Sequence, residues 1–213
     1  MKKILVIGSI NMDLVAKVDH IVNPGETISV SETDEFFGGK GANQSAAVAK
    51  AGGKVSMIGK VGNDSYGDKA IDNLSDIGVD VSGIMRDEKI PTGYAFITVD
   101  KMGENAIVVV RGANGHVTVE DIKKKSQLIT DCDILLIQQE IPAETIEYAI
   151  DFAREKGKYI ILNPAPVKRI KGETIAKVNL VTPNETEAEA LMEYLTGKTI
   201  DDFGLLVKEI ENY

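Results

Sequence analysis

Short apolar runs alternate along this chain with segments whose apolar residues recur at helical spacing. Residues 4–7, 134–137 and 159–162 are continuous apolar runs that end at glycine or polar residues. Such runs are typical of strands buried on both faces. Helical patterns lie between them, at residues 41–51, 65–77 and 146–153 among others. The alternation predicts an α/β fold with a doubly wound, mainly parallel sheet flanked by helices.

A second kind of strand pattern interrupts this alternation. Around residues 14–18, 28–31, 94–99 and 106–110, apolar and polar residues take turns, which indicates half-exposed strands. They come from two segments, 13–37 and 91–113. We interpret these segments as a small antiparallel sheet that projects from the main domain as a lid. The α/β core would then comprise residues 1–12, 38–90 and 114–213.

Composition and charge exclude several classes of partner and site. The 213 residues carry a net charge of −9 and no extended basic cluster, which disfavours nucleic acid or an anionic membrane as the main partner. Cys132 is the only cysteine and there are two histidines, so neither an intrachain disulfide nor a structural zinc site is expected. No apolar stretch is long enough to span a membrane, and the cytoplasm is the expected compartment.

The stretch Gly38-Gly39-Lys40-Gly41-Ala42-Asn43 precedes a predicted helix of small residues. Glycines allow a ligand to approach the main chain, and a helix N-terminus offers free N–H groups. The alternative interpretation is a tight turn with Lys40 in water. The stretch is not a phosphate-binding P-loop, because that motif requires Ser or Thr after its lysine and here Gly41 follows. Gly8 likewise lacks the further glycines of a dinucleotide-binding motif.

Polar residues follow two of the predicted buried strands. Asn11 and Asp13 come after the first strand, and Glu140 comes after residues 134–137. In open α/β sheets ligands bind at the carboxyl ends of the strands. A carboxylate beside an amide suits vicinal hydroxyl groups, because the carboxylate accepts from both hydroxyls. The alternatives are a turn-forming pair at residues 11 and 13, and a solvent-facing acid before Pro142.

A further polar group opens a predicted helix near residue 182. Thr182 and Glu185 have the spacing of a capping box, with Pro183 at the first helical position. This prediction explains Glu185 by local structure but leaves Asn184 and Glu187 unexplained. Both would lie at a helix N-terminus, where phosphate and its magnesium ion can bind.

Six short motifs carry a resemblance to a known family. They are Gly8-Ser9-Ile10-Asn11-Met12-Asp13, Pro24-Gly25-Glu26-Thr27, Phe37-Gly38-Gly39-Lys40-Gly41-Ala42-Asn43-Gln44, Gly112-Ala113-Asn114, Asn163-Pro164-Ala165-Pro166 and Thr182-Pro183-Asn184-Glu185-Thr186-Glu187-Ala188-Glu189. In this order and over the length of the chain, they resemble the ribokinase-like carbohydrate kinases. Within that family the resemblance is greatest to the members that phosphorylate ribose.

The resemblance implies transfer of the γ-phosphoryl group of ATP to the primary hydroxyl of D-ribose, giving ribose 5-phosphate. It implies that Val109 is an apolar lid contact over the sugar, that Asn184 is a ligand of the nucleotide phosphates, and that Glu187 holds Mg²⁺ through water. It also implies that the sugar is bound by Asn11, Asp13, Gly39, Lys40, Asn43 and Glu140. The family also implies a monovalent cation, K⁺, and a homodimer formed through the lid sheets.

One departure from the family concerns catalysis itself. The motif Asp-Thr-x-Gly-Ala-Gly-Asp, whose last Asp is the family's catalytic base, does not occur in this sequence. The adenine pocket and the monovalent-cation site belong to the same missing region. We therefore expect the amino-terminal part of such a kinase, binding sugar weakly at best and transferring phosphate poorly or not at all. The alternatives are a non-catalytic sugar-binding or interaction fragment, and a kinase for another sugar or a nucleoside.

Overall fold

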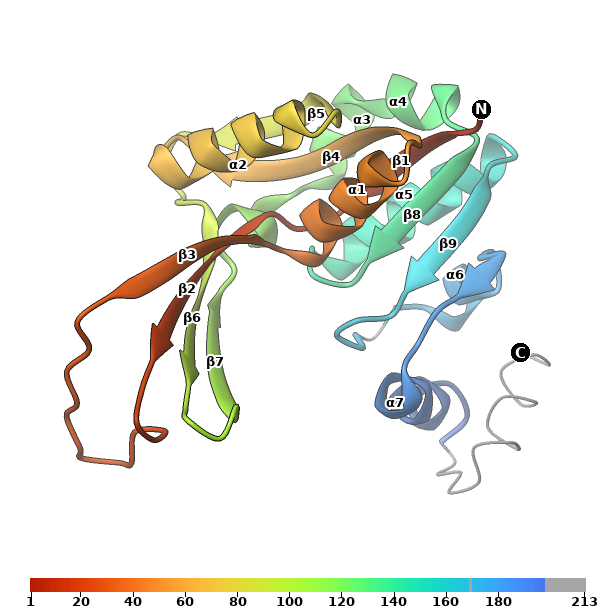
Figure 1. Cartoon of the computed structure of the whole chain (residues 1–213). Coiled ribbons are helices and arrows are strands. Elements are labelled where there is room, and N and C mark those ends of the chain that lie inside the picture. The colour runs from red at the N-terminus through yellow and green to blue at the C-terminus, as the bar shows by residue number, and fades with distance from the viewer. Residues whose placement is uncertain (169, 198–213) are drawn as a thin grey trace.

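The computed structural model describes residues 1–168 and 170–197, which form two sheets and their flanking helices (Figure 1). The larger sheet has six strands in the order β10-β9-β8-β1-β4-β5, and every neighbouring pair is parallel. Its strands are β1 (Lys3–Ile7), β4 (Lys54–Gly62), β5 (Asp80–Asp87), β8 (Ile134–Gln138), β9 (Tyr159–Asn163) and β10 (Leu180–Val181).

Helices cover both faces of this large sheet, as the doubly wound prediction requires. On one face lie α1 (Lys40–Lys50) and α2 (Ser65–Asp76); on the other lie α3 (Val119–Lys124), α4 (Ser126–Asp131) and α5 (Ala143–Glu155). Successive side chains of β1 divide between two cores. Leu5 and Ile7 pack on the α5 side, and Val6 packs on the α1 side. The predicted fold class is confirmed.

The remaining strands form what we call the small sheet, in the order β3-β2-β6-β7. Its strands are β2 (Asn11–Lys17), β3 (Thr33–Gly38), β6 (Gly93–Val99) and β7 (Asn105–Val110). The sequence predicted an antiparallel sheet, but the β2–β6 pair is parallel, so the sheet is mixed. Strands β2 and β6 both start where the chain leaves the large sheet, with Asn11 paired to Gly93. They therefore run in the same direction.

Two local predictions were wrong. The half-exposed strand expected at residues 28–31 is an irregular segment, and β3 begins at Thr33 because its ladder with β2 ends at the pair Ala16–Thr33. In the sequence, Val119, Ile122 and Ile129 recur after Thr118 at a spacing that predicts one helix, but the structure splits this segment at Lys125 into α3 and α4. The apolar residues Ile200, Phe203, Val207 and Ile210 predict a further helix, which lies outside the described residues.

The other described helical segments are η1 (Gly112–His116), α6 (Gly172–Ile175) and α7 (Glu185–Thr196). The first of these follows β7 directly, where the chain returns from the small sheet to the large one. None of the described helices combines the length and the apolar character needed to cross a membrane. Figure 1 shows the small sheet and α7 on the same side of the large sheet, toward the carboxyl ends of β8 and β9.

Candidate functional site

The candidate site is built where β1 ends and α1 begins. The backbone of α1 approaches the β1–β2 connection so closely that a Cβ on Gly41 would lie 2.7 Å from Ser9 N. Gly39 has φ +90°, and its added Cβ would lie 2.8 Å from Asn11 N. Glycine permits both the left-handed conformation and the close contact. The glycine stretch thus places the N-terminus of α1 directly against Ser9 and Asn11.

Glu140 lies at this helix N-terminus. Its Oε2 accepts a hydrogen bond of 3.1 Å from Lys40 N and a short hydrogen bond from Ser9 Oγ. Main-chain N–H groups in the first turn of a helix favour a negative charge, so the carboxylate is stabilised there. The structure therefore brings Glu140, from the end of β8, together with Lys40, a hundred residues away. Ser9 had no role in the sequence prediction, although it belongs to one of the six motifs.

Asn11 and Asp13 lie two residues apart on β2, so their side chains project from the same face of the small sheet. Asn11 is buried, and its Oδ1 accepts a hydrogen bond of 2.7 Å from Asn114 Nδ2. Burial, followed by the negative charge of Glu140, raises the pKa of the Asp13 carboxyl above its ordinary value. The negative charge of Glu140 therefore acts on the Asp13 carboxyl.

Val109 is on the same face of the small sheet as Asp13. The register pairs Asp13 with Ala95 on β6, and Ala95 with Val109 on β7. A cavity of about 150 Å³ opens beside this row. Its lining includes Ser9, Asn11, Val109, Asn114 and Glu140. Sequence reasoning missed Ala95, although the alternation that places Val109 on this face also places Ala95 there.

The lining of this cavity also includes two cationic residues, Arg111 and Lys168. Burial, followed by the positive charge of Arg111, lowers the pKa of the Lys168 ammonium. Lys168 Nζ donates a hydrogen bond of 2.8 Å to Ile141 O. The cavity therefore has an acidic side at Glu140 and a basic side at these two residues.

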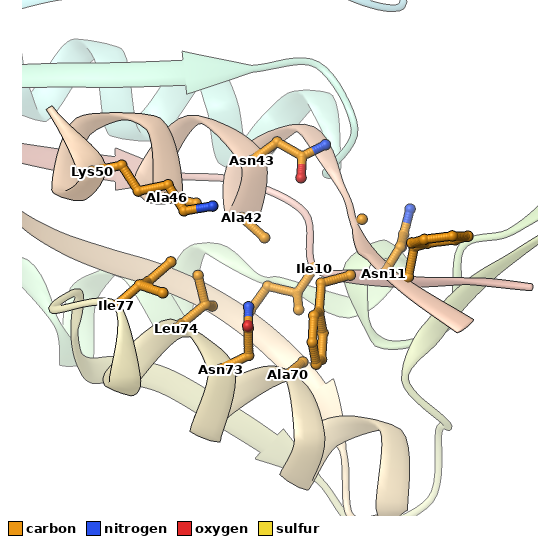
Figure 2. A pocket seen from close by; sticks show the side chains of 13 residues that line it. Ile10, Asn11, Ala42, Asn43, Ala46, Lys50, Ala70, Asn73, Leu74 and Ile77 are labelled. Atoms are coloured by element: carbon orange, nitrogen blue, oxygen red, sulfur yellow. The ribbon is translucent and has the colours of Figure 1, made fainter. Parts of the chain in front are cut away.

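A second cavity, of about 230 Å³, lies between α1 and α2 (Figure 2). Ala42 and Lys50 of α1 face Leu74 of α2 and Ile77, the residue after this helix, across the cavity. Its lining includes both Asn43, from the first turn of α1, and Asn11. Asn43 and Val109 thus line different cavities, and Asn11 lines both.

The predicted capping box of α7 was wrong. The helix begins at Glu185, and Asn184 is its N-cap. Asn184 Oδ1 accepts from Glu187 N at 2.8 Å, and Glu187 Oε2 accepts from Asn184 N at 3.0 Å. Thr182 cannot cap the helix because its main chain still pairs with β9, where Thr182 N donates to Leu162 O at 3.0 Å. Asn184 and Glu187 therefore have the local role that the sequence assigned to Thr182 and Glu185.

This capping limits what Glu187 can do with a metal. One carboxylate oxygen is engaged by Asn184 N. Within residues 1–168 and 170–197, no group of three or more His, Cys, Asp or Glu side chains could hold a metal ion. Mg²⁺ keeps several water ligands and often needs only one or two carboxylates together with substrate phosphates. The single carboxylate of Glu187 at the start of α7 fits that mode of binding. The described residues around it do not provide a site in which all ligands come from the protein.

Comparisons with known proteins give the family. The model of the pfkB family of carbohydrate kinases matches residues 1–211. The ribokinase of Haemophilus influenzae is 38% identical over 207 residues, which cover 97% of this chain and 66% of that protein.

Two solved structures have the same fold. Ribokinase from Thermotoga maritima is 37% identical, with a TM-score of 0.90 over 100% of this chain and 69% of that one. Arabidopsis thaliana ribokinase, complexed with ribose and ATP, is 27% identical, with a TM-score of 0.85 over 99% and 69%.

The chain spans about two thirds of the length of the relatives that it matches. The family match nevertheless extends over nearly all of the chain. Ser9, Lys40 and Asn114, which meet where β1 ends and α1 begins, come from three of the six motifs. On this evidence the chain belongs to the pfkB family of carbohydrate kinases.

Proposed function

We propose that this chain binds D-ribose between α1, β2 and the loop after β8, within a protein that phosphorylates ribose with ATP to give ribose 5-phosphate. The observation that carries the proposal is the convergence of Asn11, Asp13 and Glu140 at the N-terminus of α1. The chain's ribokinase relatives support it, and one of their structures holds ribose and ATP.

The chemistry of these residues suits a small polyol. Two carboxylates accept hydrogen bonds from neighbouring hydroxyl groups, and Asn11 keeps its Nδ2 as a donor because Oδ1 is engaged by Asn114. Gly39 lets a hydroxyl approach the main chain, and Lys40 and Asn43 supply further polar groups from α1. Val109 and Ala95 would cover the apolar face of the sugar ring from the small sheet.

The small sheet would act as a lid. Its strands connect to the large sheet through main-chain crossings that lie at one edge of the proposed site. Closure over the sugar would exclude water and so suppress hydrolysis of ATP. Phosphoryl transfer depends mainly on positioning and on charge neutralisation, which a closed polar site provides.

For the nucleotide, we propose that Asn184 and Glu187 lie near the ATP phosphates at the start of α7. Glu187 would hold Mg²⁺ through water, and the ion would neutralise phosphate charge during transfer. The expected K⁺ stays a prediction of the family resemblance.

The 213 residues contain no Asp-Thr-x-Gly-Ala-Gly-Asp motif, so we propose that on their own they bind sugar with little turnover. Loss of a general base typically slows a reaction by about 10²–10⁴-fold.

We also propose a homodimer formed through the small sheet. Its strands expose several large apolar side chains, which in a monomer would face water. Those more than half exposed are Phe36, Phe96, Ile107, Val108 and Val109. A second copy would cover the face of this sheet that carries Phe96 and Val108, and would also pair or shield the strand edges of β3 and β7.

Calorimetric titration of the purified chain with D-ribose, 2-deoxyribose, fructose and a nucleoside tests the substrate. We expect D-ribose to bind best, and Asp13→Asn or Glu140→Gln to weaken binding by about tenfold or more, because charge-assisted hydrogen bonds are lost. The exposed acid Glu120 on α3 provides a control, since Glu120→Gln leaves the site intact.

The same titrations separate the alternatives. A higher affinity for another sugar or for a nucleoside than for D-ribose would contradict ribose as the substrate. Ribose binding that is indifferent to both site variants would contradict the proposed site. A parallel coupled assay with ATP measures turnover, and rates typical of a full-length kinase would contradict the proposed lack of catalysis.

A further inference from the structure

Among residues 1–168 and 170–197, the main chain crosses between the two sheets four times, and these crossings meet around Ile10. The chain leaves β1 for β2 through Ile10 and returns from β3 to α1 through Gly39. It leaves β5 for β6 at Gly93 and returns from β7 to η1 at Gly112. Any movement of the small sheet relative to the large sheet must be accommodated at this junction.

Asn114, in η1, lies at the centre of the junction and is 1% exposed. Its Oδ1 accepts from Ile10 N at 2.8 Å. Its Nδ2 donates to Ile10 O at 2.9 Å and to Asn11 Oδ1 at 2.7 Å. Both N–H groups of the amide are therefore used, and the third bond reaches a side chain of the proposed sugar site.

On one side, the absence of a side chain at Gly93 makes room for this amide. A Cβ on Gly93 would lie 2.2 Å from Asn114 Nδ2 and 2.4 Å from Asn11 Oδ1. On another side, a Cβ on Gly39 would lie 2.9 Å from Ile10 Cα. A side chain at Gly93 would therefore displace the amide of Asn114, and a side chain at Gly39 would displace the main chain of Ile10.

We propose that Asn114 is a positioning residue that sets which atom of the Asn11 amide faces the sugar. This inference rests on the proposed function. Because Asn114 donates to Asn11 Oδ1, the Nδ2 of Asn11 remains to donate to a sugar hydroxyl. Without Asn114 the Asn11 amide can turn over and present its oxygen among the carboxylates of Asp13 and Glu140. The same side chain holds the main chain of Ile10, so the orientation of Asn11 is coupled to the crossing between the sheets.

A double-mutant cycle on the full chain tests this role, with D-ribose affinity measured by calorimetry. We expect Asn114→Ala to weaken binding by about tenfold, the effect of losing a buried hydrogen bond. In an Asn11→Ala background the same change should have no further effect, because Asn114 acts through Asn11. Effects that multiply in the double variant would overturn the proposal. Asn114→Asp, which keeps the shape and the acceptor but loses the donor, serves the same test should the alanine variant not fold.

Thr145→Val is the matched control. Thr145 is fully buried, and its Oγ1 donates at 2.8 Å to Val117 O, just beyond η1. The variant loses a buried hydrogen bond to the same segment without touching Asn11. We expect its ribose affinity to stay within about twofold of the unaltered chain. An equal loss of affinity in this control would overturn the specific role of Asn114.

Hydrogen exchange measured by NMR gives a second test that needs no sugar. The Ile10 amide should be protected in the unaltered chain and exchange faster in Asn114→Ala, while the amide of Val6 in β1 keeps its protection. Unchanged protection of Ile10 would overturn the positioning role whatever the sugar result. Faster exchange at Ile10 in a chain that binds no ribose would overturn the proposed function and leave the link between Asn114 and Ile10 supported.

Discussion

At the scale of single residues, the surroundings of Asp13 disfavour the ionised form of its carboxyl group. Burial, and then the charge of Glu140, raises its pKa above the ordinary 3.8. Ionisation of Asp13 therefore destabilises the folded chain above that pKa. Sugar hydroxyls that donate to the ionised carboxylate would offset this cost, so ligand binding and ionisation are linked.

This linkage predicts a pH dependence of sugar binding. As the pH is lowered from 7, D-ribose affinity should fall with a midpoint above 3.8, because Asp13 takes up a proton and loses its charge. Calorimetric titrations across this range measure the midpoint. Asp13→Asn should bind weakly at every pH and show no such midpoint. A midpoint at or below 3.8, or one that persists in Asp13→Asn, would contradict the assignment to Asp13.

Gly39 allows a second prediction at the same scale. Gly39→Ala should place a methyl group 2.8 Å from Asn11 N in a backbone of φ +90°, combining strain with overpacking. We expect a loss of about 3 kcal/mol in the free energy of unfolding. Gly52 is a matched control with φ +81° and, among the described residues, no heavy atom within 4 Å of an added Cβ. Gly52→Ala should cost only about 1 kcal/mol.

Urea denaturation of both variants gives the comparison. Gly39→Ala should also weaken D-ribose binding, because Asn11 must shift, whereas Gly52→Ala should leave binding unchanged. Equal stability of the two alanine variants would show that the contact between Gly39 and Asn11 does not restrict the site.

At the scale of elements, a buried ion pair ties β4 to α3 and η1. Lys60 Nζ donates to Asp121 Oδ2 at 2.5 Å and to His116 O at 2.7 Å. Burial of Asp121 opposes its ionisation, but hydrogen bonds from Lys60 and Thr118 outweigh it and lower the pKa of the Asp121 carboxyl. This ion pair supports η1, the element that carries Asn114.

Removal of Asp121 should therefore be costly. Asp121→Ala leaves the Lys60 ammonium buried without its partner, and we expect the free energy of unfolding to fall by about 3 kcal/mol. Because the folded pKa of Asp121 is lowered, its contribution is present above pH 3.8 and is lost as the pH falls through the folded value. Urea denaturation at several pH values measures both effects. Glu120→Ala, at a neighbouring exposed acid, should change stability little.

Sequence patterns predicted the buried strands of the large sheet because both of their faces must be apolar. They did not predict β5, an edge strand in which Asp80, Ser82 and Arg86 interrupt the apolar pattern. They also misplaced the start of α7. Thr182 has the right residue type and spacing for a cap, but its pairing with β9 is a tertiary contact that no local pattern reveals.

The candidate site was predictable where it follows the topology of the sheet. Asn11, Asp13 and Glu140 could be found because polar residues after buried strands gather at one edge. Ser9 and Asn114 could not be assigned roles, because their partners lie 131 and 103 residues away in the chain. Their motifs were recognisable in sequence, but their hydrogen bonds are visible only in the folded chain.

At the scale of the whole molecule, the small sheet exposes large apolar side chains that a single copy of the chain leaves uncovered. Its face that includes Asp13 and Val109 is the one that we propose to face the sugar, and Val109 of this face lines the cavity at Glu140. On the opposite face, the register places Phe96 of β6 beside Val108 of β7, and these side chains are 51% and 64% exposed. Because the proposed lid would close its first face over the sugar, we expect the second copy to cover the face with Phe96 and Val108.

Sedimentation velocity of the purified chain tests this arrangement. We expect the unaltered chain to sediment as a dimer and the paired variant Phe96→Ser/Val108→Ser as a folded monomer, since the apolar area that holds the copies together is removed. Ile107 is 53% exposed on the sugar-facing side and provides the comparison, with Ile107→Ser expected to remain dimeric. A dimer that survives the paired change but is lost with Ile107→Ser would move the interface to the sugar-facing side. A monomeric unaltered chain would exclude the dimer, and the exposed apolar side chains would then require another partner.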